Sequence, residues 1–344
     1  MGQSTITRVR LKNFTAFKEL DIKFGLGINA FIGTNGTGKT HLLKSVYSAC
    51  DFARGNGSFT GKLIRVFLPF QSRIGRLVFR QRGRNSAVLE IYRGLKRIKI
   101  SFSNISKTSA KVLGKDRWTT DRIQCAYIPV KEMLANSPGF RSLYSDREIH
   151  FEEIYVDIID KALKPLLRGP PDISRKELLK IIEKSIEGKI VLTDEEFFLN
   201  NRQGRLEFTL LAEGMRKLGL LWLLIQNGTL LKGSILFWDE PETNLNPKLM
   251  GTVVDILLKL QLLGVQIFIA THDYVLLKEF DLRKTAKNKI MYHSLYRDPK
   301  NKEIMHSFTN DFVSIEPNAI SDTFMDLYDR DVERALELNT RKNK

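Results

Sequence analysis

The chain has little cysteine, little histidine and no long apolar run. Its 344 residues include 2 cysteines, Cys50 and Cys125, which lie far apart, and 5 histidines without metal-ligand spacing. The strongest apolar run, 218–225, is well short of the roughly 18 residues needed to cross a bilayer. The N-terminus shows no basic stretch followed by an apolar core. These absences argue against a disulfide scaffold, a zinc module and a membrane protein, and we expect a cytoplasmic location with no membrane partner.

Acidic residues are also in short supply, and the deficit is local. The chain has 55 Lys and Arg against 39 Asp and Glu, a net charge of +16. Residues 62–122 hold 16 basic and 3 acidic residues, and therefore carry +13 of this excess. The arginines of 73–84 suit contact with duplex phosphates, whereas the lack of interleaved aromatics argues against a single-strand groove. We predict duplex nucleic acid as a partner through 62–122; a solvated face and an acidic protein partner remain alternatives.

Hydrophobic patterning predicts two kinds of β structure. Residues 8–12 and 20–24 alternate apolar and polar, as half-buried strands do. Alternation at 98–102 predicts that the basic segment is an antiparallel β region. Continuous apolar runs, typical of central parallel strands covered on both faces, occupy 28–32, 123–130, 234–238 and 265–270.

Helices are expected between these runs. The pattern predicts helices over 213–226 and 247–263, the second starting at Pro247. Residues 145–190 look helical, with a capping box from Ser174 to Glu177 and a stop at Gly188. A hairpin (289–296 and 303–308) and a final helix near 319–336 should complete the chain. Repeats and sustained heptads are lacking, which excludes a long coiled-coil arm.

A glycine-rich segment fits the P-loop pattern at every position. It runs Gly33-Thr34-Asn35-Gly36-Thr37-Gly38-Lys39-Thr40, after an apolar strand and before a helix that starts near His41. Glycines allow backbone N–H groups to surround phosphate oxygens, and the helix N-terminus adds a positive dipole end. We expect Lys39 to reach the β- and γ-phosphates and the Thr40 hydroxyl to bind Mg²⁺.

Two further strand ends carry polar residues suited to nucleotide chemistry. The run Ile235-Leu236-Phe237-Trp238 ends in Asp239 and Glu240. We expect Asp239 to hold Mg²⁺ through water and Glu240 to activate the attacking water as general base. His272 directly follows another apolar run, where a sensor of the γ-phosphate belongs. A single histidine or a pair of acids would be a weak signal; their order along the chain makes the combination informative.

The segment Leu211-Ala212-Glu213-Gly214-Met215-Arg216 resembles the signature motif of ABC ATPases, and the order P-loop, signature, Walker B, His272 is that family's order. The chain is more closely similar to the AAA-15/AAA-21 group of bacterial ATPases, related to RecF, SMC and OLD heads. Arg10-Leu11-Lys12-Asn13-Phe14 looks like the start of that group, and Asp239-Glu240-Pro241-Glu242-Thr243-Asn244-Leu245-Asn246-Pro247 is similar to its Walker B and D-loop. Tyr127-Ile128-Pro129 resembles its Q-loop region, although Gln124 comes too early.

The resemblance implies an α/β fold, a P-loop NTPase with an ABC-type head: a central parallel sheet, an antiparallel β region and a helical lobe. It implies ATP and Mg²⁺ as cofactors and two heads that close around ATP. The implied catalytic residues are Glu240, His272 and Lys39; the nucleotide-binding residues are Gly33, Asn35, Gly36, Thr37, Gly38, Lys39, Thr40, His41, Asp239, Asn13, Gly214, Glu213 and Asn244; the Mg²⁺ ligands are Thr40 and Asp239. Ala212 replaces the usual Ser of the signature and Asn246 the usual His of the D-loop, which bears on turnover and dimer coupling.

We therefore expect five regions: an N-terminal ATPase lobe (1–61), the basic β region (62–125), a helical lobe (126–205), a C-terminal ATPase lobe (206–296) and a hairpin end with a helix (297–344). Too few residues follow His272 for the Toprim nuclease of OLD proteins, so a nuclease or toxin effector should be a separate protein. The expected function is an ATP-dependent switch that controls such an effector in anti-phage defence. A RecF-like DNA-repair ATPase is the alternative, and a transporter subunit is a weaker third.

Overall fold

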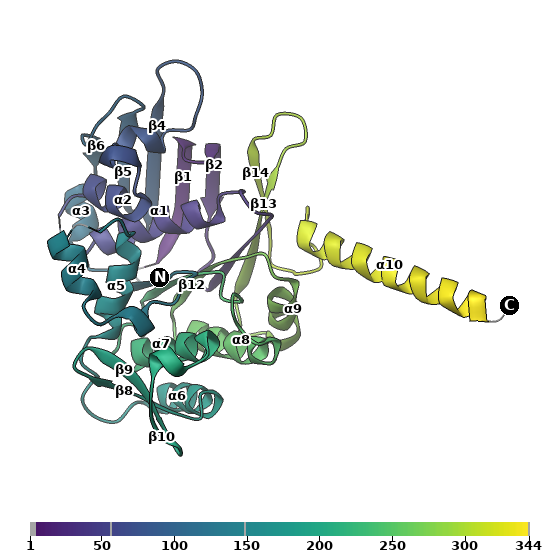
Figure 1. Ribbon diagram of the computed structural model, residues 1–344. Coiled ribbons are helices and arrows are strands. Elements are labelled where there is room, and N and C mark those ends of the chain that lie inside the picture. The colour runs from purple at the N-terminus through teal and green to yellow at the C-terminus, as the bar shows by residue number, and fades with distance from the viewer. Residues whose placement is uncertain (1–4, 56, 148, 343–344) are drawn as a thin grey trace.

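The parallel sheet predicted from the apolar runs forms the centre of the molecule. A computed structural model describes residues 5–55, 57–147 and 149–342. The central sheet has the order β14-β13-β3-β12-β11-β7. Figure 1 labels β12, β13 and β14 of this sheet. Its strands are β3 (Ile28–Ile32), β7 (Cys125–Ile128), β11 (Ile235–Asp239), β12 (Gln266–Thr271), β13 (Ile290–Arg297) and β14 (Ile304–Thr309). All adjacent pairs are parallel except β13 with β14, and the four predicted apolar strands are confirmed.

Helices cover both faces of this sheet and enclose two hydrophobic cores. One face packs against α1 (Lys39–Phe52), with Phe31, Phe237 and Phe268 turned toward it. The other face packs against α7 (Glu213–Gln226), α8 (Pro247–Leu262) and α9 (Tyr274–Arg283). The predictions of helices over 213–226 and 247–263 are confirmed to within a residue. Burial on both faces explains why the central strands are continuous apolar runs.

An antiparallel sheet lies beyond α1, in the order β2-β1-β4-β5-β6. It consists of β1 (Ile6–Phe14), β2 (Phe17–Lys23), β4 (Ser86–Arg93), β5 (Lys96–Ser103) and β6 (Lys111–Leu113), with α2 (Phe59–Phe67) and α3 (Lys115–Thr119) at its sides. The antiparallel strands expected in the basic segment are confirmed. Strands from the first 61 residues and from the basic segment thus share one sheet.

The region from 126 to 205, predicted to be a helical lobe, contains three helices and also a small sheet. Its helices are α4 (Phe140–Arg147), α5 (Glu153–Ala162) and α6 (Ile173–Ser185). A three-stranded sheet, β10-β9-β8, follows them, with β8 (Gly188–Thr193), β9 (Glu196–Asn201) and β10 (Gly204–Glu207). The capping-box prediction was wrong, because the Asp172 carboxylate caps α6 by accepting from the Arg175 N–H at 2.9 Å. Gly188 begins β8 rather than stopping the helix.

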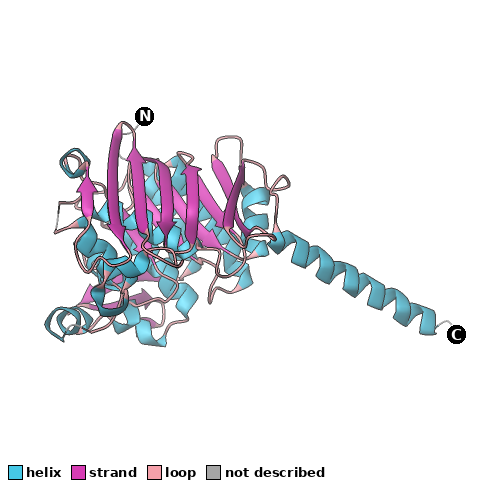
Figure 2. Ribbon diagram, turned by 90° about the horizontal axis from the view of Figure 1, so that it is seen from above, coloured by secondary structure: helices cyan, strands magenta, loops and turns pink. Residues whose placement is uncertain are grey.

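The C-terminal segment matches its prediction and leaves the body of the molecule. The β13–β14 hairpin is followed by α10 (Ala319–Lys342), which projects away from the sheets (Figure 2). Short 3₁₀ turns occupy Phe70–Ser72, Ile74–Leu77, Leu134–Asn136 and Phe208–Leu210. Among the described residues, no helix is long and apolar enough to cross a bilayer.

Candidate functional site: a nucleotide edge

The P-loop turns at the carboxyl end of β3 and leads into α1. Gly36 and Gly38 have φ of 77° and 85°, which side chains rarely adopt. A Cβ on Gly38 would lie 2.5 Å from the Phe17 ring, so the close approach of β2 also requires glycine. The Lys39 ammonium donates to the carbonyls of Gly33 (2.6 Å) and Thr34 (3.1 Å). Burial lowers the pKa of Lys39, which is poised to exchange these carbonyls for phosphate oxygens.

A buried carboxylate and a hydroxyl meet beside the P-loop, although they are 199 residues apart in sequence. The Thr40 hydroxyl donates to Asp239 Oδ1 at 3.1 Å, and the Tyr127 hydroxyl donates to Asp239 Oδ2 at 3.0 Å. Burial raises the pKa of Asp239. Hard oxygen donors of this kind suit Mg²⁺, and a cation there would relieve the cost of the buried charge. The residues present therefore fit the expected metal.

Glu240 directly follows β11 and His272 directly follows β12, and their side chains meet at this edge of the sheet. Glu240 has φ of 48°, an uncommon conformation for a residue other than glycine, and its N–H donates to the Ala270 carbonyl at 2.9 Å. His272 Nδ1 lies 3.3 Å from Glu240 Oε1. The carboxylate that would activate water and the imidazole that would sense phosphate are thus in direct contact.

Glu242 holds this corner together and was given no role from the sequence. Its Oε1 accepts from the Thr271 hydroxyl at 2.7 Å and from the His272 N–H at 3.1 Å. Burial raises the pKa of Glu242. The last glutamate of the Asp-Glu-Pro-Glu motif was a signal for this residue, but the spacing could not show that its side chain faces β12 rather than the nucleotide. Tyr127 was also missed as a partner of Asp239.

The signature residues form a separate group on the N-terminus of α7. The Asn244 amide donates to Glu213 Oε2 at 2.8 Å, and a Cβ on Gly214 would lie 3.3 Å from the Asn244 carbonyl. Ala212 occupies the N-cap without a side-chain bond to the helix. The buried Lys217 ammonium donates to the Thr243 carbonyl (2.6 Å), and the Thr243 hydroxyl donates to Glu240 Oε2 (3.2 Å). The signature is therefore linked to Walker B through the D-loop.

Three further residues that are expected to bind nucleotide have the following surroundings in the structure. The Asn13 amide donates to the Ser86 carbonyl at 3.3 Å, and Phe17 is the residue of that turn that contacts the P-loop. The His41 ring lies 5.8 Å from the Phe67 ring. Asn35 is exposed on the loop. The P-loop is also braced by Arg297 of β13, which donates to the Gly36 carbonyl at 2.7 Å.

The basic segment is divided between buried and exposed charges. Lys62 is only 4% exposed and pairs with Asp51, Glu153 and Asp157, so it does not belong to the surface. One exposed group is the arginine loop, which we define as Arg80, Arg82 and Arg84. It precedes β4, whose first residue Ser86 contacts Asn13 at the end of β1. The arginine loop therefore lies at the same end of the antiparallel sheet as the turn that contacts the P-loop.

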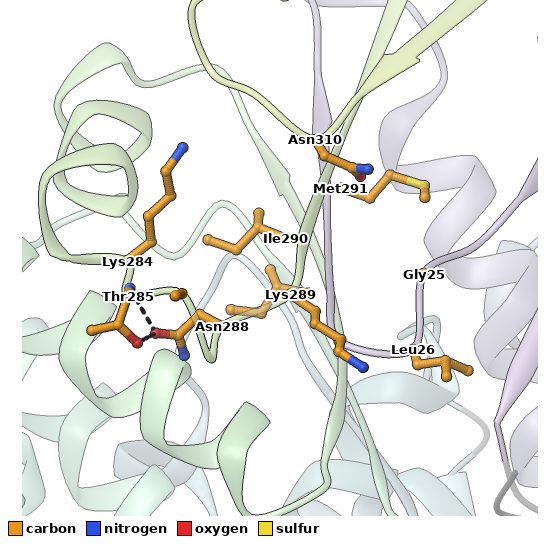
Figure 3. Close-up of a pocket in the computed structure, with 12 residues that line it drawn as sticks. Gly25, Leu26, Lys284, Thr285, Asn288, Lys289, Ile290, Met291 and Asn310 are labelled. Carbon is orange, nitrogen blue, oxygen red and sulfur yellow. Dashed lines mark hydrogen bonds between the residues drawn. The ribbon is translucent and has the colours of Figure 1, made fainter.

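A cavity of about 550 Å³ lies at the opposite edge of the central sheet (Figure 3). It is lined by residues that precede β3 and β13, among them Leu26, Asn288 and Lys289. Ligands of open α/β sheets bind at the carboxyl ends of the strands, and this cavity is at the amino ends. The position of this cavity therefore differs from that expected for a nucleotide, which is the P-loop edge.

Comparison with known families gives matches over most of these motifs. The family model described as "AAA domain, putative AbiEii toxin, Type IV TA system" matches residues 101–278. The RecF protein of Cytophaga hutchinsonii is 49% identical over 45 residues, 13% of this chain and 12% of that protein. The RecF protein of Clostridium botulinum is 28% identical over 145 residues, 42% of this chain and 38% of that protein. The chain thus spans less than half the length of these relatives.

Solved structures of SMC heads share the fold. An SMC head bound to the C-terminal winged-helix domain of ScpA has a TM-score of 0.55 at 16% identity, over 89% of this chain and 97% of that one. The Pyrococcus furiosus SMC head with an extended coiled coil, bound to the C-terminal domain of ScpA, has a TM-score of 0.50 at 12% identity, over 98% and 99%. These likenesses support the fold and leave the activity to be argued from the site.

Proposed function

Because the chain belongs to the AAA_21 family of ABC-type P-loop ATPases, in the RecF and SMC group, we propose that it binds ATP with Mg²⁺, hydrolyses it and closes into a dimer around the nucleotide. The observation that carries the proposal is the meeting of Lys39, Thr40, Asp239, Glu240 and His272 at one edge of the sheet. Few other activities require a phosphate-binding loop, a buried carboxylate and a paired carboxylate and imidazole in one place.

Each residue has a distinct task in this mechanism. Lys39 would neutralise the β- and γ-phosphates. Thr40 and Asp239 would hold Mg²⁺, which would supply further positive charge to offset the negative charge of the phosphates. Glu240 accepts a proton from the attacking water. His272 orients the γ-phosphate, while Glu242 keeps the His272 backbone in place.

The proposed dimer is based on the N-terminus of α7, which would supply one half of the nucleotide site of a second chain. The N-terminus of α7 has no side-chain cap, so its N–H groups can bind an anion. In the proposed dimer, this N-terminus, with Glu213, Gly214 and Asn244, contacts the γ-phosphate held by the P-loop of the second chain. Backbone N–H groups would replace the serine hydroxyl that is missing at Ala212. Loss of the γ-phosphate would remove the bridge and open the dimer.

The basic surface is the proposed nucleic-acid interface. The arginine loop lies at the nucleotide end of the antiparallel sheet, where closure of two heads would bring two such loops together. Among the residues that the structure describes, the ion pairs of this segment involve other side chains, including Lys96 and Lys99, which leaves the arginine loop available for phosphates. We propose weak duplex binding with little sequence preference, supported by the local +13 charge.

We further propose that the switch controls a separate nuclease or toxin in anti-phage defence. The family description, which names a toxin and a toxin–antitoxin system, supports a defence-related role and names no separate effector. The test is incubation of purified protein with Mg²⁺ or Mn²⁺, ATP and plasmid, single-stranded DNA or RNA. We expect no cleavage until the effector is added. Cleavage by the chain alone that persists in Glu240→Gln protein would contradict this division of labour.

The second candidate function is a DNA-repair ATPase without a toxic effector, favoured by the RecF relatives. The two roles differ in what the neighbouring genes encode and in what expression does to cells. A nuclease or toxin gene alongside, with growth arrest only when both are expressed, supports the defence role. Rescue of DNA-damage sensitivity by the chain alone would instead support repair.

The core proposal is tested by measuring Mg²⁺-dependent release of phosphate from ATP by the purified chain. We expect turnover that depends on both Mg²⁺ and Lys39. ATP binding without any turnover, with or without duplex DNA, would reduce the proposal to a nucleotide-binding module.

A further inference from the structure

Two charged side chains meet beside the start of α7 without forming an aligned hydrogen bond. Arg216, on the first turn of α7, places its Nε 3.1 Å from Glu132 Oε2. Both atoms are buried, and neither has a hydrogen-bond partner among the residues that the structure describes. Arg216 Nη1 donates to the Phe208 carbonyl across 3.4 Å, which is a long bond. The guanidinium is thus held mainly by charge, and its fork of donors is poorly matched to its present partners.

The neighbouring cation is bound differently. Lys217, the next residue of α7, is fully buried, and its ammonium donates to the Thr243 carbonyl at 2.6 Å. The Arg216 side chain keeps 19% of its surface exposed. Lys217 is therefore fixed to the D-loop, whereas Arg216 can change partners at a lower cost, because its present bonds are weak.

The surroundings of Arg216 favour contact with a phosphate. Ala212 leaves the N-terminus of α7 without a side-chain cap, and Arg216 is only one turn from that end. Helical side chains lean toward the N-terminus of their helix, so an arginine at this position can reach an anion bound there. Glu213 would repel such an anion, and a nearby cation would offset this repulsion. A guanidinium also matches phosphate oxygens with two parallel hydrogen bonds.

We propose that Arg216 binds the γ-phosphate of the ATP held by a second chain, and that Glu132 restrains Arg216 until that phosphate arrives. This inference rests on the proposed ATP-bridged dimer, and it gives the dimer a side-chain cation in place of the hydroxyl missing at Ala212. Arg216 is then a catalytic residue, because it touches the substrate, whereas Glu132 is a positioning residue that acts through Arg216.

The carboxylate that restrains Arg216 is not left without a partner when the pair separates. Glu132 Oε1 accepts from the Leu134 N–H, and this bond does not involve Arg216. Keeping it lowers the cost of separating the pair. A triphosphate also carries several negative charges against the single charge of Glu132, so the exchange favours the nucleotide.

Opposite effects of two substitutions test this restraint. In Glu240→Gln protein, which should retain ATP, light scattering gives the dissociation constant of the ATP-bound dimer. Adding Arg216→Met should raise this constant by about 100-fold or more, because each of the two sites loses a charged contact. Adding Glu132→Gln should lower it by about 10-fold, because Arg216 becomes free to bind the phosphate. The control is Arg202→Met, which removes an exposed cation from the turn between β9 and β10 and should leave the constant unchanged.

The outcomes separate this inference from the function on which it rests. Weakening of the dimer by both substitutions would indicate a purely structural ion pair, and a dimer unaffected by Arg216→Met would remove the arginine from the site. Either result overturns the inference and leaves the ATP-bridged dimer standing. If Glu240→Gln protein forms no ATP-dependent dimer at all, the proposed dimer itself is wrong, and this inference fails with it.

A double substitution distinguishes lost phosphate contact from damage to the fold. Arg216→Met alone leaves the Glu132 carboxylate buried without its cation, which destabilises the chain. Combining it with Glu132→Gln removes both charges, and the dimer should remain as weak as that of Arg216→Met alone. A double variant that dimerises as tightly as the parent Glu240→Gln protein would show that the unpaired carboxylate had weakened the single variant, and would overturn the inference.

Mixing of variants tests whether Arg216 acts on the second chain. With Glu240 intact, Arg216→Met and Lys39→Ala proteins should each turn over ATP at about 1% of the wild-type rate or less. Their mixed dimer joins the P-loop of the first chain to Arg216 of the second, so mixing should restore about a quarter of the wild-type rate. No recovery on mixing, or wild-type turnover by Arg216→Met protein alone, would contradict a contact between Arg216 and the second chain's ATP.

Discussion

The nucleotide edge of the parallel sheet and the arginine loop of the antiparallel sheet place their charged residues in opposite environments. At the carboxyl edge of the parallel sheet, Lys39, Asp239 and Glu242 are buried and each has defined partners. On the antiparallel sheet and its connections, charges such as Arg82 and Arg84 are exposed. Buried charge is costly unless it is paired, and exposed charge is screened by solvent. The first region should therefore act through geometry and the second through total charge.

The largest expected effect is at the P-loop. Lys39→Ala removes a desolvated ammonium that would bind two phosphates, and charged hydrogen bonds contribute about 1.5–3 kcal/mol each. We expect ATP affinity and turnover to fall together by about 10²–10⁴-fold. Fluorescent-nucleotide titration and phosphate release measure the two effects. Near-normal turnover would place the nucleotide elsewhere.

The next effect separates binding from chemistry. Glu240→Gln keeps the size of the side chain but cannot accept a proton, so turnover should fall by about 10²–10⁴-fold while ATP affinity is retained. The variant should accumulate as an ATP-bound dimer, seen by light scattering with and without ATP. Wild-type turnover, with no change in mass on adding ATP, would remove Glu240 from the role of base.

An intermediate effect, on the affinity for duplex nucleic acid, is expected from changes in the exposed arginine loop. Changing Arg80, Arg82 and Arg84 to Glu should weaken duplex binding for every sequence. It should also reduce the slope of log affinity against log salt by about 3, one unit for each phosphate that is no longer neutralised by an arginine. Fluorescence anisotropy at several salt concentrations measures both quantities.

The matched control for this charge change lies at the other end of the sheet. Lys115, Arg117 and Arg122 are also exposed, and α3 packs beside the end of β5 near Arg97. Changing these three to Glu alters the net charge equally but should affect binding and its salt slope much less. Equal decreases in the two triple variants would mean that overall charge, and not the arginine loop, governs binding.

The smallest effect concerns pH and the buried acid. Burial raises the pKa of Asp239, so the folded state without Mg²⁺ retains a proton that the unfolded chain releases above about pH 4. The contribution of Asp239 to the free energy of unfolding should therefore fall as pH rises. Urea unfolding of wild type and Asp239→Asn between pH 4 and 8 measures the difference. A difference independent of pH would mean that Asp239 ionises without penalty.

The contrast between buried and exposed charge also explains what sequence could predict. The P-loop, Walker B and His272 have fixed spacings relative to apolar strands, because phosphate geometry requires glycines, a cation and an acid at strand ends. Their convergence followed from the parallel topology. The role of Glu242 could not be predicted, since it depends on hydrogen bonds to Thr271 and to the His272 backbone across two strands.

Two other features, the sheet of β8 to β10 and the burial of Lys62, could not be predicted from the hydrophobic and charge patterns of the sequence. The strands of the sheet β8 to β10 are short and contain few buried residues, such as Ile190 and Leu199. In the sequence, the apolar residues of β8 follow directly on the helical pattern of α6 and were therefore read as its continuation. The burial of Lys62 could not be foreseen, because its three acidic partners come from two other helices. Charge counts locate a basic segment, but only tertiary structure separates buried cations from surface ones.

The central claim is that each ATP is shared between the P-loop of one chain and the signature of another. It is tested most directly by mixing two inactive variants. Lys39→Ala disables the P-loop. Ala212→Asp places a carboxylate at the uncapped N-terminus of α7, where it can cap the helix but repels the partner's γ-phosphate. Ala212→Ser serves as the active control. The mixture has one intact composite site in each mixed dimer, so we expect turnover to return to about a quarter of the wild-type rate. No recovery on mixing, or full activity of Ala212→Asp alone, would contradict the shared site.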